Sequence, residues 1–355
     1  MSEKVLMKGN EAIAEAAIQA GCHHYFGYPI TPQTEVAAYM AKRMPKIGGT
    51  FLQAESEVSA INMVIGVAST GKRVMTSSSS PGVSLKAEGI SYLAGCDLPA
   101  VVVNVQRGGP GLGGIQPSQS DYFQSTKGGG HGDYRNIVLA PASVQEMASL
   151  TVKAFDLADK YSMVSMILAD GTMGQMMEPV SLDAGEVKTY EKPWALTGTK
   201  CEREHNIVNS LYLKPEELEI KNFERYEKYK AIEENEVMYE EYLMDDAEVC
   251  VVAFGITSRV AKNAINEARA NGVKVGMIRP ITVWPFPKKV LAEAADKCKA
   301  FICVEMSMGQ MIEDVELAIR CKKPVYLCNR VGGMIPTPEE VLAKINEVNE
   351  NGGAF

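Results

Sequence analysis

The sequence contains no uninterrupted apolar run that approaches the roughly 18 residues of a membrane-spanning helix, so we expect no such helix. Its first residues, MSEKVLMKGNEAIAEA, have neither a long apolar core nor a small-residue cleavage site, which argues against a secretory signal. Basic residues are outnumbered: 36 Lys and Arg stand against 44 Asp and Glu, and the net charge is −8. Because nucleic-acid-binding surfaces are basic, no nucleic-acid partner is expected.

The eight cysteines include no C-x-x-C pair. Among the cysteines, Cys298 and Cys303 are nearest to each other in sequence, and they lie around the apolar run AFICVEM. Zinc and iron–sulfur sites draw several thiolates from tight clusters, so the chain is predicted to hold neither a metal ion nor a cluster. Free thiols in a reducing cytoplasm are the expected state.

The length of 355 residues favours two domains. In the first, 1–185, helical periods alternate with continuous apolar runs such as PAVVVNV and VSMILAD. Continuous runs are typical of a parallel sheet covered on both faces, and the βαβ succession indicates an α/β fold. The expected strands are 23–30, 51–54, 73–80, 99–105, 136–140 and 164–170. The expected helices are 9–21, 34–44, 55–71, 83–93, 119–126 and 144–159.

The second domain, 247–355, repeats the alternation on a smaller scale and is also predicted to be α/β. Its expected strands are 248–254, 273–280, 300–306 and 324–330. Its expected helices are 258–272, 288–298, 310–321 and 337–348.

Between the domains, 186–246 is a linker rich in proline, lysine and glutamate. Its portion 214–246 is predicted to form one or two charged helices, and it carries nearly all of the net negative charge. A solvated helical linker is the simpler interpretation. The alternative is a docking arm for a partner subunit. Its contact face would consist of Phe223, Tyr226, Tyr229 and Tyr239.

Two glycine-rich stretches match nucleotide-binding patterns without the required context. Residues 66–73 match G-x-x-x-x-G-K, but a helix precedes them and Arg73 replaces the metal-binding hydroxyl. Residues 109–114 match G-x-G-x-x-G, but prolines interrupt them and no helix opens at once. We expect neither to be a nucleotide fingerprint, although a glycine-rich loop after a strand is a common ligand site in α/β proteins.

Polar segments follow four of the predicted strands. Thr31 is either the N-cap of the next helix or a hydroxyl fixed between two prolines for a ligand. Acidic residues in the first turn of helix 55–71 are favoured by the helix dipole alone, or they face a ligand. The serine run is either a solvated loop or a polar cradle, and Arg107 lies where an anion would bind. The segments are GYPITP (27–32), QAESE (53–57), TSSSSPG (76–82) and QRGGP (106–110).

In order and spacing, GYPITP, LQAESE, TSSSSPG, NVQRGGPGLG and PSQSDYFQ resemble the pyrimidine-domain (α-type) subunit of the 2-oxoacid:ferredoxin oxidoreductases, which are thiamine-diphosphate enzymes. The resemblance covers essentially the whole chain. It implies a pyrimidine-type thiamine-diphosphate-binding domain, 1–185, followed by a transketolase C-terminal-like domain, 247–355. QAESEVSAINM and KGGGHGDYRNIVLAPAS look most like the branch that acts on 3-methyl-2-oxobutanoate (2-ketoisovalerate).

The resemblance also implies residue roles. Glu57, in the family's S-E-x-x-A pattern, is the expected hydrogen-bond partner of N1′ in the aminopyrimidine ring, and Glu55 is the reserve candidate. Thr31 and Arg107 are expected to bind the carboxylate of the 2-oxoacid. An apolar substrate pocket is expected from Tyr28, Ile30, Leu112 and Ile115, and further cofactor contacts from Pro29, Ser80, Gln119 and Asp121.

The sequence lacks the family's metal–diphosphate motif, which is G-D-G with a later Asn. The nearest match, ADG at 169–171, is followed by no Asn at 190–205. The resemblance therefore implies that thiamine diphosphate is shared with a β-type subunit that holds the diphosphate and Mg²⁺. A γ-type subunit and a ferredoxin-like δ-type subunit are expected to complete the complex and its iron–sulfur clusters. Coenzyme A, a 2-oxoacid and ferredoxin are the expected reactants.

Several alternatives stay open. A pyruvate- or 2-oxoglutarate-specific member of the family would share these motifs, although a second substrate carboxylate needs its own buried cation. Beyond Arg107, the strand ends offer only Lys127 and His131 for that purpose. The β-type subunit of a lipoamide-linked 2-oxoacid dehydrogenase has the same domain order but would not carry YPITP. A regulatory subunit with a decayed site would not be expected to keep Thr31, Glu57 and Arg107.

Overall fold

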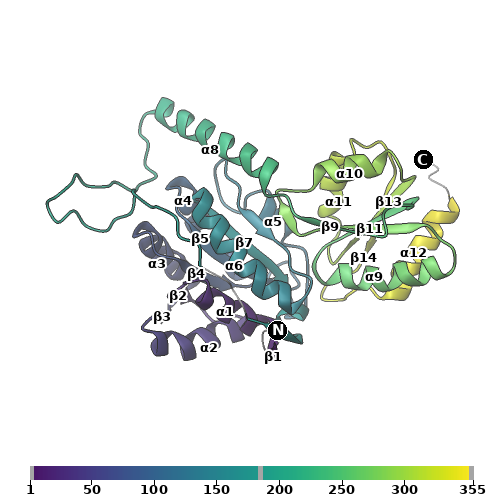
Figure 1. Cartoon of the computed structure of the whole chain (residues 1–355), viewed down its shortest axis with the longest axis horizontal. Helices are drawn as coiled ribbons and strands as arrows, with labels where there is room; N and C mark the ends of the chain where they lie inside the picture. Colours follow the sequence, from purple (N-terminus) through teal and green to yellow (C-terminus); the bar gives the residue numbers. More distant parts are fainter. Residues whose placement is uncertain (1–3, 183–186, 352–355) are drawn as a thin grey trace.

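A seven-stranded sheet is the centre of the N-terminal domain in this computed structural model, which describes residues 4–182 and 187–351 (Figure 1). The strand order is β12-β6-β7-β5-β4-β2-β3. All neighbours are parallel except β12, which is antiparallel to β6. The strands are β2 His24–Gly27, β3 Thr50–Gln53, β4 Val74–Ser78, β5 Ala100–Gln106, β6 Ile137–Leu139, β7 Val164–Asp170 and β12 Thr282–Trp284.

Helices cover both faces of this sheet, which confirms the α/β prediction. Helix α1 packs against α2 and α6, whereas α3 packs against α4. Every residue of β4, β5 and β7 is therefore buried, as the continuous apolar runs predicted. The helices are α1 Gly9–Gln19, α2 Thr34–Arg43, α3 Glu57–Ser69, α4 Ser80–Gly95, α5 Tyr122–Thr126, α6 Val144–Tyr161 and α7 Gly171–Gln175.

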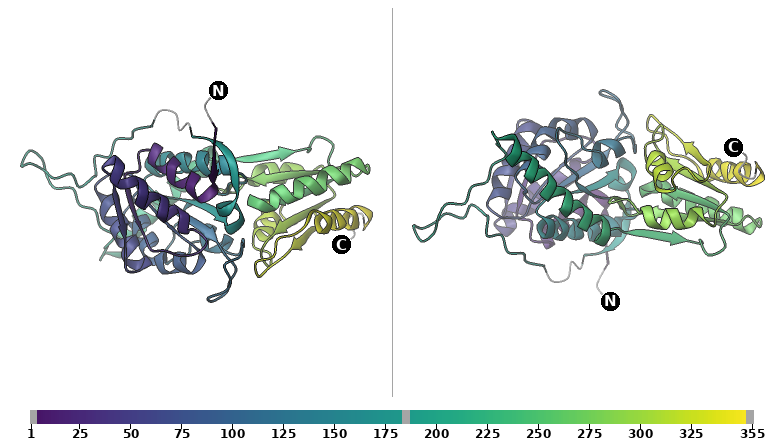
Figure 2. Two further views of the ribbon diagram at one scale, coloured as in Figure 1. Left: turned by 90° about the horizontal axis from the view of Figure 1, so that it is seen from below. Right: turned by 90° about the horizontal axis from the view of Figure 1, so that it is seen from above.

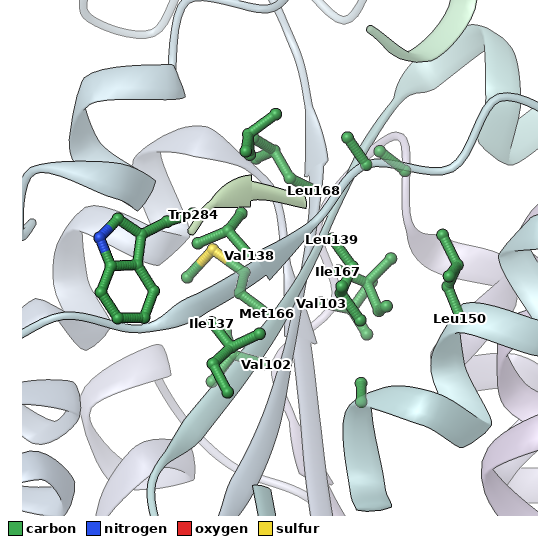
Figure 3. Close-up of a cluster of buried hydrophobic side chains, with 14 of the residues drawn as sticks. Val102, Val103, Ile137, Val138, Leu139, Leu150, Met166, Ile167, Leu168 and Trp284 are labelled. Atoms are coloured by element: carbon green, nitrogen blue, oxygen red, sulfur yellow. The ribbon is translucent and has the colours of Figure 1, made fainter. Parts of the chain in front are cut away.

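Branched and aliphatic side chains of the central strands fill the core of this domain (Figure 3). Val102 and Val103 from β5 lie beside Met166 and Ile167 from β7, and all four are at most 1% exposed. Trp284 enters the same cluster although it comes from the C-terminal part of the sequence. Burial of such side chains stabilises a domain by about 1.5–3 kcal/mol each.

A second sheet, in the order β14-β13-β10-β11-β9, forms the C-terminal domain, which lies beside the first domain (Figure 2). Only β9 is antiparallel to its neighbour. Helix α9 packs against α12, and α10 packs against α11. The elements are β9 Tyr239–Tyr242, β10 Val249–Ala253, α9 Gly255–Ala270, β11 Val275–Pro280, α10 Lys288–Ala295, β13 Ala300–Glu305, α11 Met311–Ala318, β14 Val325–Asn329 and α12 Pro338–Asn351.

The predicted charged helix over 214–246 is only partly correct. Helix α8, Pro215–Asn235, is followed by strand β9, which pairs with β11. The four aromatic residues assigned to a contact face do not share one, because Tyr229 is buried against Trp284 and Tyr239 belongs to β9. The helix also docks on its own chain: Lys228 Nζ lies 2.7 Å from Asp97 Oδ1.

Three further strands were not anticipated. Lys4–Lys8 (β1) and Met177–Ser181 (β8) pair with each other, antiparallel, and β12 joins the N-terminal sheet from beyond β11. None of the helices in the described residues combines the length and the apolarity that crossing a bilayer requires.

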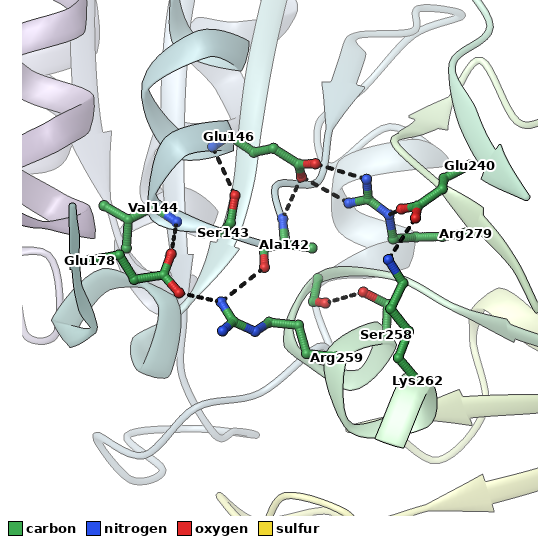
Figure 4. A network of polar contacts seen from close by, with 11 residues as sticks. Ala142, Ser143, Val144, Glu146, Glu178, Glu240, Ser258, Arg259, Lys262 and Arg279 are labelled. Carbon is green, nitrogen blue, oxygen red and sulfur yellow. Dashed lines mark hydrogen bonds and ion pairs between the residues drawn. The ribbon is translucent and has the colours of Figure 1, made fainter. Parts of the chain in front are cut away.

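An ion-pair network fixes the C-terminal domain against the start of α6 (Figure 4). Arg279 donates to both carboxylate oxygens of Glu146 at 2.8 Å and to Glu240 at 2.7 Å. Its side chain is only 4% exposed. A second bridge joins Arg259 to Glu178 at 2.7 Å. The two domains therefore hold a fixed relation at the edge of the first sheet where the candidate site lies.

Candidate active site

Four loops meet at the carboxyl edge of the N-terminal sheet, because β2, β3, β4 and β5 are parallel and end there. Ligands of α/β proteins bind at this edge. Tyr28–Pro32 follows β2, residues 54–57 follow β3, residues 79–82 follow β4, and Arg107 follows β5. The structure thus brings all four polar segments singled out in the sequence together.

Glu57 is the first residue of α3, and its neighbour Ser56 caps the helix by accepting a hydrogen bond from Ser59 N at 3.2 Å. Glu57 is 5% exposed. Among the described residues, no group donates a hydrogen bond to its carboxylate. Its oxygens are not among the fully buried atoms that lack a partner, so the carboxylate keeps some contact with solvent at the site.

Glu55 is in a different position. It is exposed, and the Ser59 hydroxyl donates a hydrogen bond to its carboxylate. That bond lowers the pKa of Glu55 from its usual value. Because Glu55 faces solvent with its partner already in place, Glu57 is the better candidate for a ligand.

Helix α4 can approach the Glu57 carboxylate closely because residue 82 is glycine. A Cβ at Gly82 would stand 2.6 Å from Glu57 Oε1 and would collide with Ser78 Oγ. The hydroxyls of Ser78 and Ser79 are buried and have no hydrogen-bond partner in the structure. The Glu57 carboxylate and two unpaired hydroxyls lie close together here, and a ligand that carries both hydrogen-bond donors and acceptors would satisfy them.

Arg107 joins the turn after β2 to the glycine-rich loop. Its Nη1 donates to the Thr31 carbonyl at 3.0 Å and its Nη2 to the Leu112 carbonyl at 3.2 Å. Its Nε is buried without a partner. Thr31 is itself exposed, and its backbone lies against the Arg107 guanidinium. Tyr28 and Pro29 are exposed and Ile30 is half-buried in the same turn.

Ser80 and Asp121 lie together behind this loop. Ser80 Oγ donates to Asp121 Oδ2 at 2.6 Å, and Asn104 Nδ2 donates to the same oxygen at 2.9 Å. Burial raises the pKa of Asp121, while these two bonds oppose the rise. The backbone N–H of Arg107 donates to Ser80 Oγ at 3.0 Å. These contacts fix the start of the glycine-rich loop.

A cavity of about 760 Å³ opens between this loop and the C-terminal domain. Ser80, Asp121, Gln124 and Gly109–Gly111 line one side, and Met306–Met308 with Gln310 line the other. No lysine or arginine is among its lining residues. Leu112 and Ile115, which were expected in a substrate pocket, are instead 86% and 58% exposed on the loop that borders it.

The structure does not bring Gln119 to Glu57. The Gln119 side chain donates from Nε2 to the Phe254 carbonyl at 2.8 Å and accepts from Met306 N at 3.0 Å, so it joins the two domains. Asp170 of the ADG sequence is also engaged: it accepts from Thr172 N at 2.9 Å and caps α7. Burial raises the pKa of Asp170 to about 6.

Lys127 and His131, the candidate cations for a second substrate carboxylate, lie on the exposed loop after α5. Lys127 forms an ion pair with Asp314 of the C-terminal domain. His131 is exposed, and its ring lies edge-on to Tyr92. In the described residues, no group of three or more His, Cys, Asp or Glu side chains is arranged to hold a metal ion.

Lys86 was missed in the sequence. It is 0% exposed, and its Nζ donates to Thr76 Oγ1 at 2.6 Å and to the Ser77 carbonyl at 3.0 Å. Burial lowers its pKa to about 7, and the attraction of Glu57 opposes that shift. A signal was present: Lys86 continues the apolar helical stripe of Val83, Ile90 and Leu93.

Two family models match the chain. Residues 15–242 match the thiamine-diphosphate-binding domain of pyruvate flavodoxin/ferredoxin oxidoreductases. Residues 247–341 match core domain II of pyruvate:ferredoxin oxidoreductase.

Two relatives align with nearly the whole length of this chain. A ketoisovalerate oxidoreductase subunit VorB from Methanothermobacter marburgensis is 54% identical and covers 97% of each chain. A 2-oxoglutarate synthase subunit KorA from the same organism is 36% identical, over 97% of this chain and 99% of its own.

Among solved structures, 2-oxoglutarate:ferredoxin oxidoreductase from Magnetococcus marinus, with 2-oxoglutarate, coenzyme A and succinyl-CoA bound, is 28% identical with a TM-score of 0.86. The match covers 98% of this chain but only 65% of that one. A split-gene transketolase shares the fold, with a TM-score of 0.62 at 13% identity. The predicted fold and the resemblance seen in the motifs are both confirmed.

Proposed function

Because the chain belongs to the family of 2-oxoacid:ferredoxin oxidoreductases, we propose that it supplies the pyrimidine-binding half of a thiamine diphosphate site in a complex that oxidises branched-chain 2-oxoacids. Members of this family are subunits of oxidoreductases that decarboxylate 2-oxoacids oxidatively with ferredoxin as the electron acceptor. In the proposed reaction, 3-methyl-2-oxobutanoate and coenzyme A give an acyl-CoA and CO₂, and two electrons pass to ferredoxin.

The observation that carries the proposal is the Glu57 carboxylate, which has no hydrogen-bond donor among the described residues and lies against Gly82. Glu57 would hold the proton-bearing N1′ edge of the aminopyrimidine ring, and Ser78 and Ser79 offer hydroxyls to the same ring. When bound, thiamine diphosphate supplies the nucleophilic carbon and the electron sink. A carboxylate shielded from water binds such a partner more strongly than an exposed one.

Arg107 and Thr31 would anchor the carboxylate of the 2-oxoacid. The buried Arg107 Nε has no partner, and the guanidinium is held in place by two backbone carbonyls. A guanidinium fixed in this way grips an anion with little loss of conformational freedom. The neighbouring Thr31 hydroxyl adds one directed donor.

The partner that holds the diphosphate and Mg²⁺ would cover the outer face of α3 and α4. Apolar side chains are exposed there around Glu57: Leu52 is 39% exposed, Val58 43% and Leu85 53%. Helix α3 also exposes Asn62 and Gly66 on this face. Exposed apolar side chains beside a half-built site are typical of a subunit interface. We assign it to the β-type subunit, and the iron–sulfur clusters to the γ- and δ-type subunits.

A branched-chain substrate fits better than 2-oxoglutarate. A second substrate carboxylate would need another buried cation, since an unpaired charge costs several kcal/mol. Lys127 is already paired with Asp314, and the lining of the large cavity includes no lysine or arginine. The 54% identity to ketoisovalerate oxidoreductase subunits, against 36% to a 2-oxoglutarate synthase subunit, supports the same assignment.

The test is a substrate competition on the complex assembled from this chain and its co-expressed partner subunits. We expect 3-methyl-2-oxobutanoate and its branched homologues all to react, with kcat/KM values that differ by at most about 10–200-fold per methylene, because an apolar pocket separates them by only about 1–3 kcal/mol per methylene. A higher kcat/KM for 2-oxoglutarate would overturn the substrate assignment. Tight Mg²⁺-dependent binding of thiamine diphosphate by this chain alone, measured by calorimetry, would overturn the shared site.

A further inference from the structure

We propose that Gln33 is a positioning residue for the substrate carboxylate: its buried side chain fixes the turn after β2, which presents Thr31 and holds Arg107. The inference rests on the proposed function, because Thr31 and Arg107 are the groups assigned there to the carboxylate of the 2-oxoacid. Gln33 itself does not reach the substrate, since none of its surface is exposed. It acts through the turn.

Gln33 lies at a position where a helix-capping side chain would be expected. It is the N-cap residue of α2, which begins at Thr34, yet its side chain makes no hydrogen bond to the first turn of that helix. Serine, threonine, aspartate and asparagine are the usual residues at such a position. The glutamine side chain runs back instead, and its Nε2 donates to the Tyr28 carbonyl at 3.3 Å. Because the backbone N–H of Gln33 also donates to the Ile30 carbonyl at 3.2 Å, this one residue holds the turn at two points.

A chain of three hydrogen bonds fixes the Gln33 amide in one orientation. A backbone carbonyl can only accept, so the end of the amide that faces the Tyr28 carbonyl is the NH₂ group. The other end, Oε1, accepts from Ser77 Oγ at 2.5 Å. The single proton of the Ser77 hydroxyl is used in that bond, so the Tyr25 hydroxyl, 2.7 Å away, donates to Ser77 Oγ. Tyr25, Ser77 and Gln33 are all fully buried, and the chain therefore lies out of contact with solvent.

The carbonyls of the turn are its points of attachment. At one end, Asn10 Nδ2 donates to the Pro32 carbonyl at 2.8 Å, and Gln33 secures the other end. Between these two points, the Thr31 carbonyl accepts from Arg107 Nη1 at 3.0 Å. Asn10, like Gln33, is fully buried. The contact between Arg107 and the turn therefore depends on a backbone whose position two buried amides determine.

Loss of the Gln33 amide should displace the groups that bind the substrate and leave those that bind the cofactor in place. The hydrogen bonds of Gln33 go to the turn, to α2 and to Ser77 on β4. Glu57, by contrast, is on α3. A small misplacement of a group that positions the substrate can cost a large factor in its use. A residue that only supported the fold would affect substrate binding, cofactor binding and turnover together.

The experiment compares KM with kcat in the assembled complex. Gln33→Leu removes both hydrogen bonds of the amide and keeps a side chain of similar size. We expect KM for 3-methyl-2-oxobutanoate to rise about ten-fold or more, the effect of losing one hydrogen bond to an ionised group. The kcat should change by less than about three-fold, because the lost contact serves the bound substrate and the transition state alike. The affinity for thiamine diphosphate with Mg²⁺, measured by calorimetry, should match the wild type.

Two further variants test the hydrogen-bond chain. Ser77→Ala leaves Gln33 Oε1 without its donor but keeps the bond to Tyr28, so KM should rise less than in Gln33→Leu. Tyr25→Phe removes only the far end of the chain, and KM should match the wild type because Ser77 still donates to Gln33. Ser77→Ala also carries the test should Gln33→Leu fail to assemble. An unchanged KM in the assembled Ser77→Ala complex would then overturn the inference.

Gln145→Leu is the matched control. Gln145 is a half-buried glutamine of the same domain whose amide also binds backbone groups. It donates to the Ser181 carbonyl at 3.1 Å and accepts from Ser181 N at 2.9 Å. Ser181 ends β8, which pairs with β1 and is not among the strands that end at the site. This replacement should leave KM, kcat and the cofactor affinity unchanged.

An unchanged KM in an assembled Gln33→Leu complex would overturn the inference. So would a loss of kcat and of cofactor affinity as large as the rise in KM, because Gln33 would then be a structural residue. A rise in KM with Tyr25→Phe as large as that with Gln33→Leu would show that packing, and not the amide, sets KM. The proposed function stands after any of these results. Failure of the assembled wild-type complex to oxidise any 2-oxoacid would instead overturn the proposed function itself.

Discussion

Removal of the Lys86 ammonium group should change how the stability of the chain depends on pH. Burial holds the Lys86 pKa at about 7 in the folded chain, against 10.5 as its ordinary value. The unfolded chain therefore binds one more proton than the folded chain between these two values, and stability rises with pH across that window. The full shift corresponds to roughly 5 kcal/mol at 1.36 kcal/mol per pKa unit.

Unfolding can be measured between about pH 6 and about pH 9. Over this range the titration of Lys86 should raise the free energy of unfolding by about 2.5 kcal/mol. Lys86→Met removes this contribution. The free energy of unfolding in urea should therefore rise with pH by about 2.5 kcal/mol more in the wild type than in the variant. Tryptophan fluorescence is a suitable probe, because both tryptophans, Trp194 and Trp284, pack against the core that includes the N-terminal sheet.

Measuring the free energy of unfolding at two pH values separates the effect of the Lys86 charge from the effect of its packing and hydrogen bonds. Lys86→Met also loses the hydrogen bonds to Thr76 and Ser77, but that loss is the same at both pH values and cancels in the difference. Lys192→Met tests whether any large lysine replacement gives the same result. Parallel pH dependence of the wild type and Lys86→Met, within about 0.5 kcal/mol, would refute the reasoning, since Lys86 would then titrate alike in both states.

Three further predictions concern the site. Glu57→Gln should abolish most 2-oxoacid oxidation with the complex intact, whereas Glu55→Gln should lose much less activity in the same assay. The reverse order would assign the aminopyrimidine-binding carboxylate to Glu55. Arg107→Lys should raise KM for the 2-oxoacid about ten-fold or more, because an ammonium cannot reproduce the planar, multi-donor geometry of the guanidinium, and KM for ferredoxin should stay constant. Gly82→Ala should weaken calorimetrically measured cofactor binding at least ten-fold, because its Cβ would displace the Ser78 hydroxyl and the Glu57 carboxylate. Unchanged affinity would place the ring elsewhere.

Strands and helices could be predicted from the sequence where the pattern of apolar residues within the segment itself determines the structure. The strands of both parallel sheets and the helices between them form near the predicted positions, because each buried strand is a continuous apolar run and each helix has its own apolar stripe. The convergence of Thr31, Glu57 and Arg107 followed from the same pattern, since parallel strands end at one edge. These features depend on residues close together in sequence.

The missed elements depend on distant residues. Strand β12 has only three residues and lies between prolines, and it forms because β6 offers a free edge more than 140 residues earlier in the sequence. Tyr239–Tyr242 continues a charged helix in composition, yet it pairs with the edge of β11. Strands β1 and β8 have five residues each and pair only with each other. No local periodicity distinguishes such segments from loops.

The unpaired polar atoms of the site explain why a half-site can be stable and still require a partner. Buried groups without partners cost about 1–3 kcal/mol each, and Ser78 Oγ, Ser79 Oγ and Arg107 Nε all stand at this edge of the sheet. Exposed apolar side chains flank the same edge, and burial of these side chains by a partner would offset that cost in the assembled complex. Cofactor binding would pair the polar atoms and partner binding would exclude the water that competes for them. Each event therefore increases the gain from the other, and the two should be linked in the assembled enzyme.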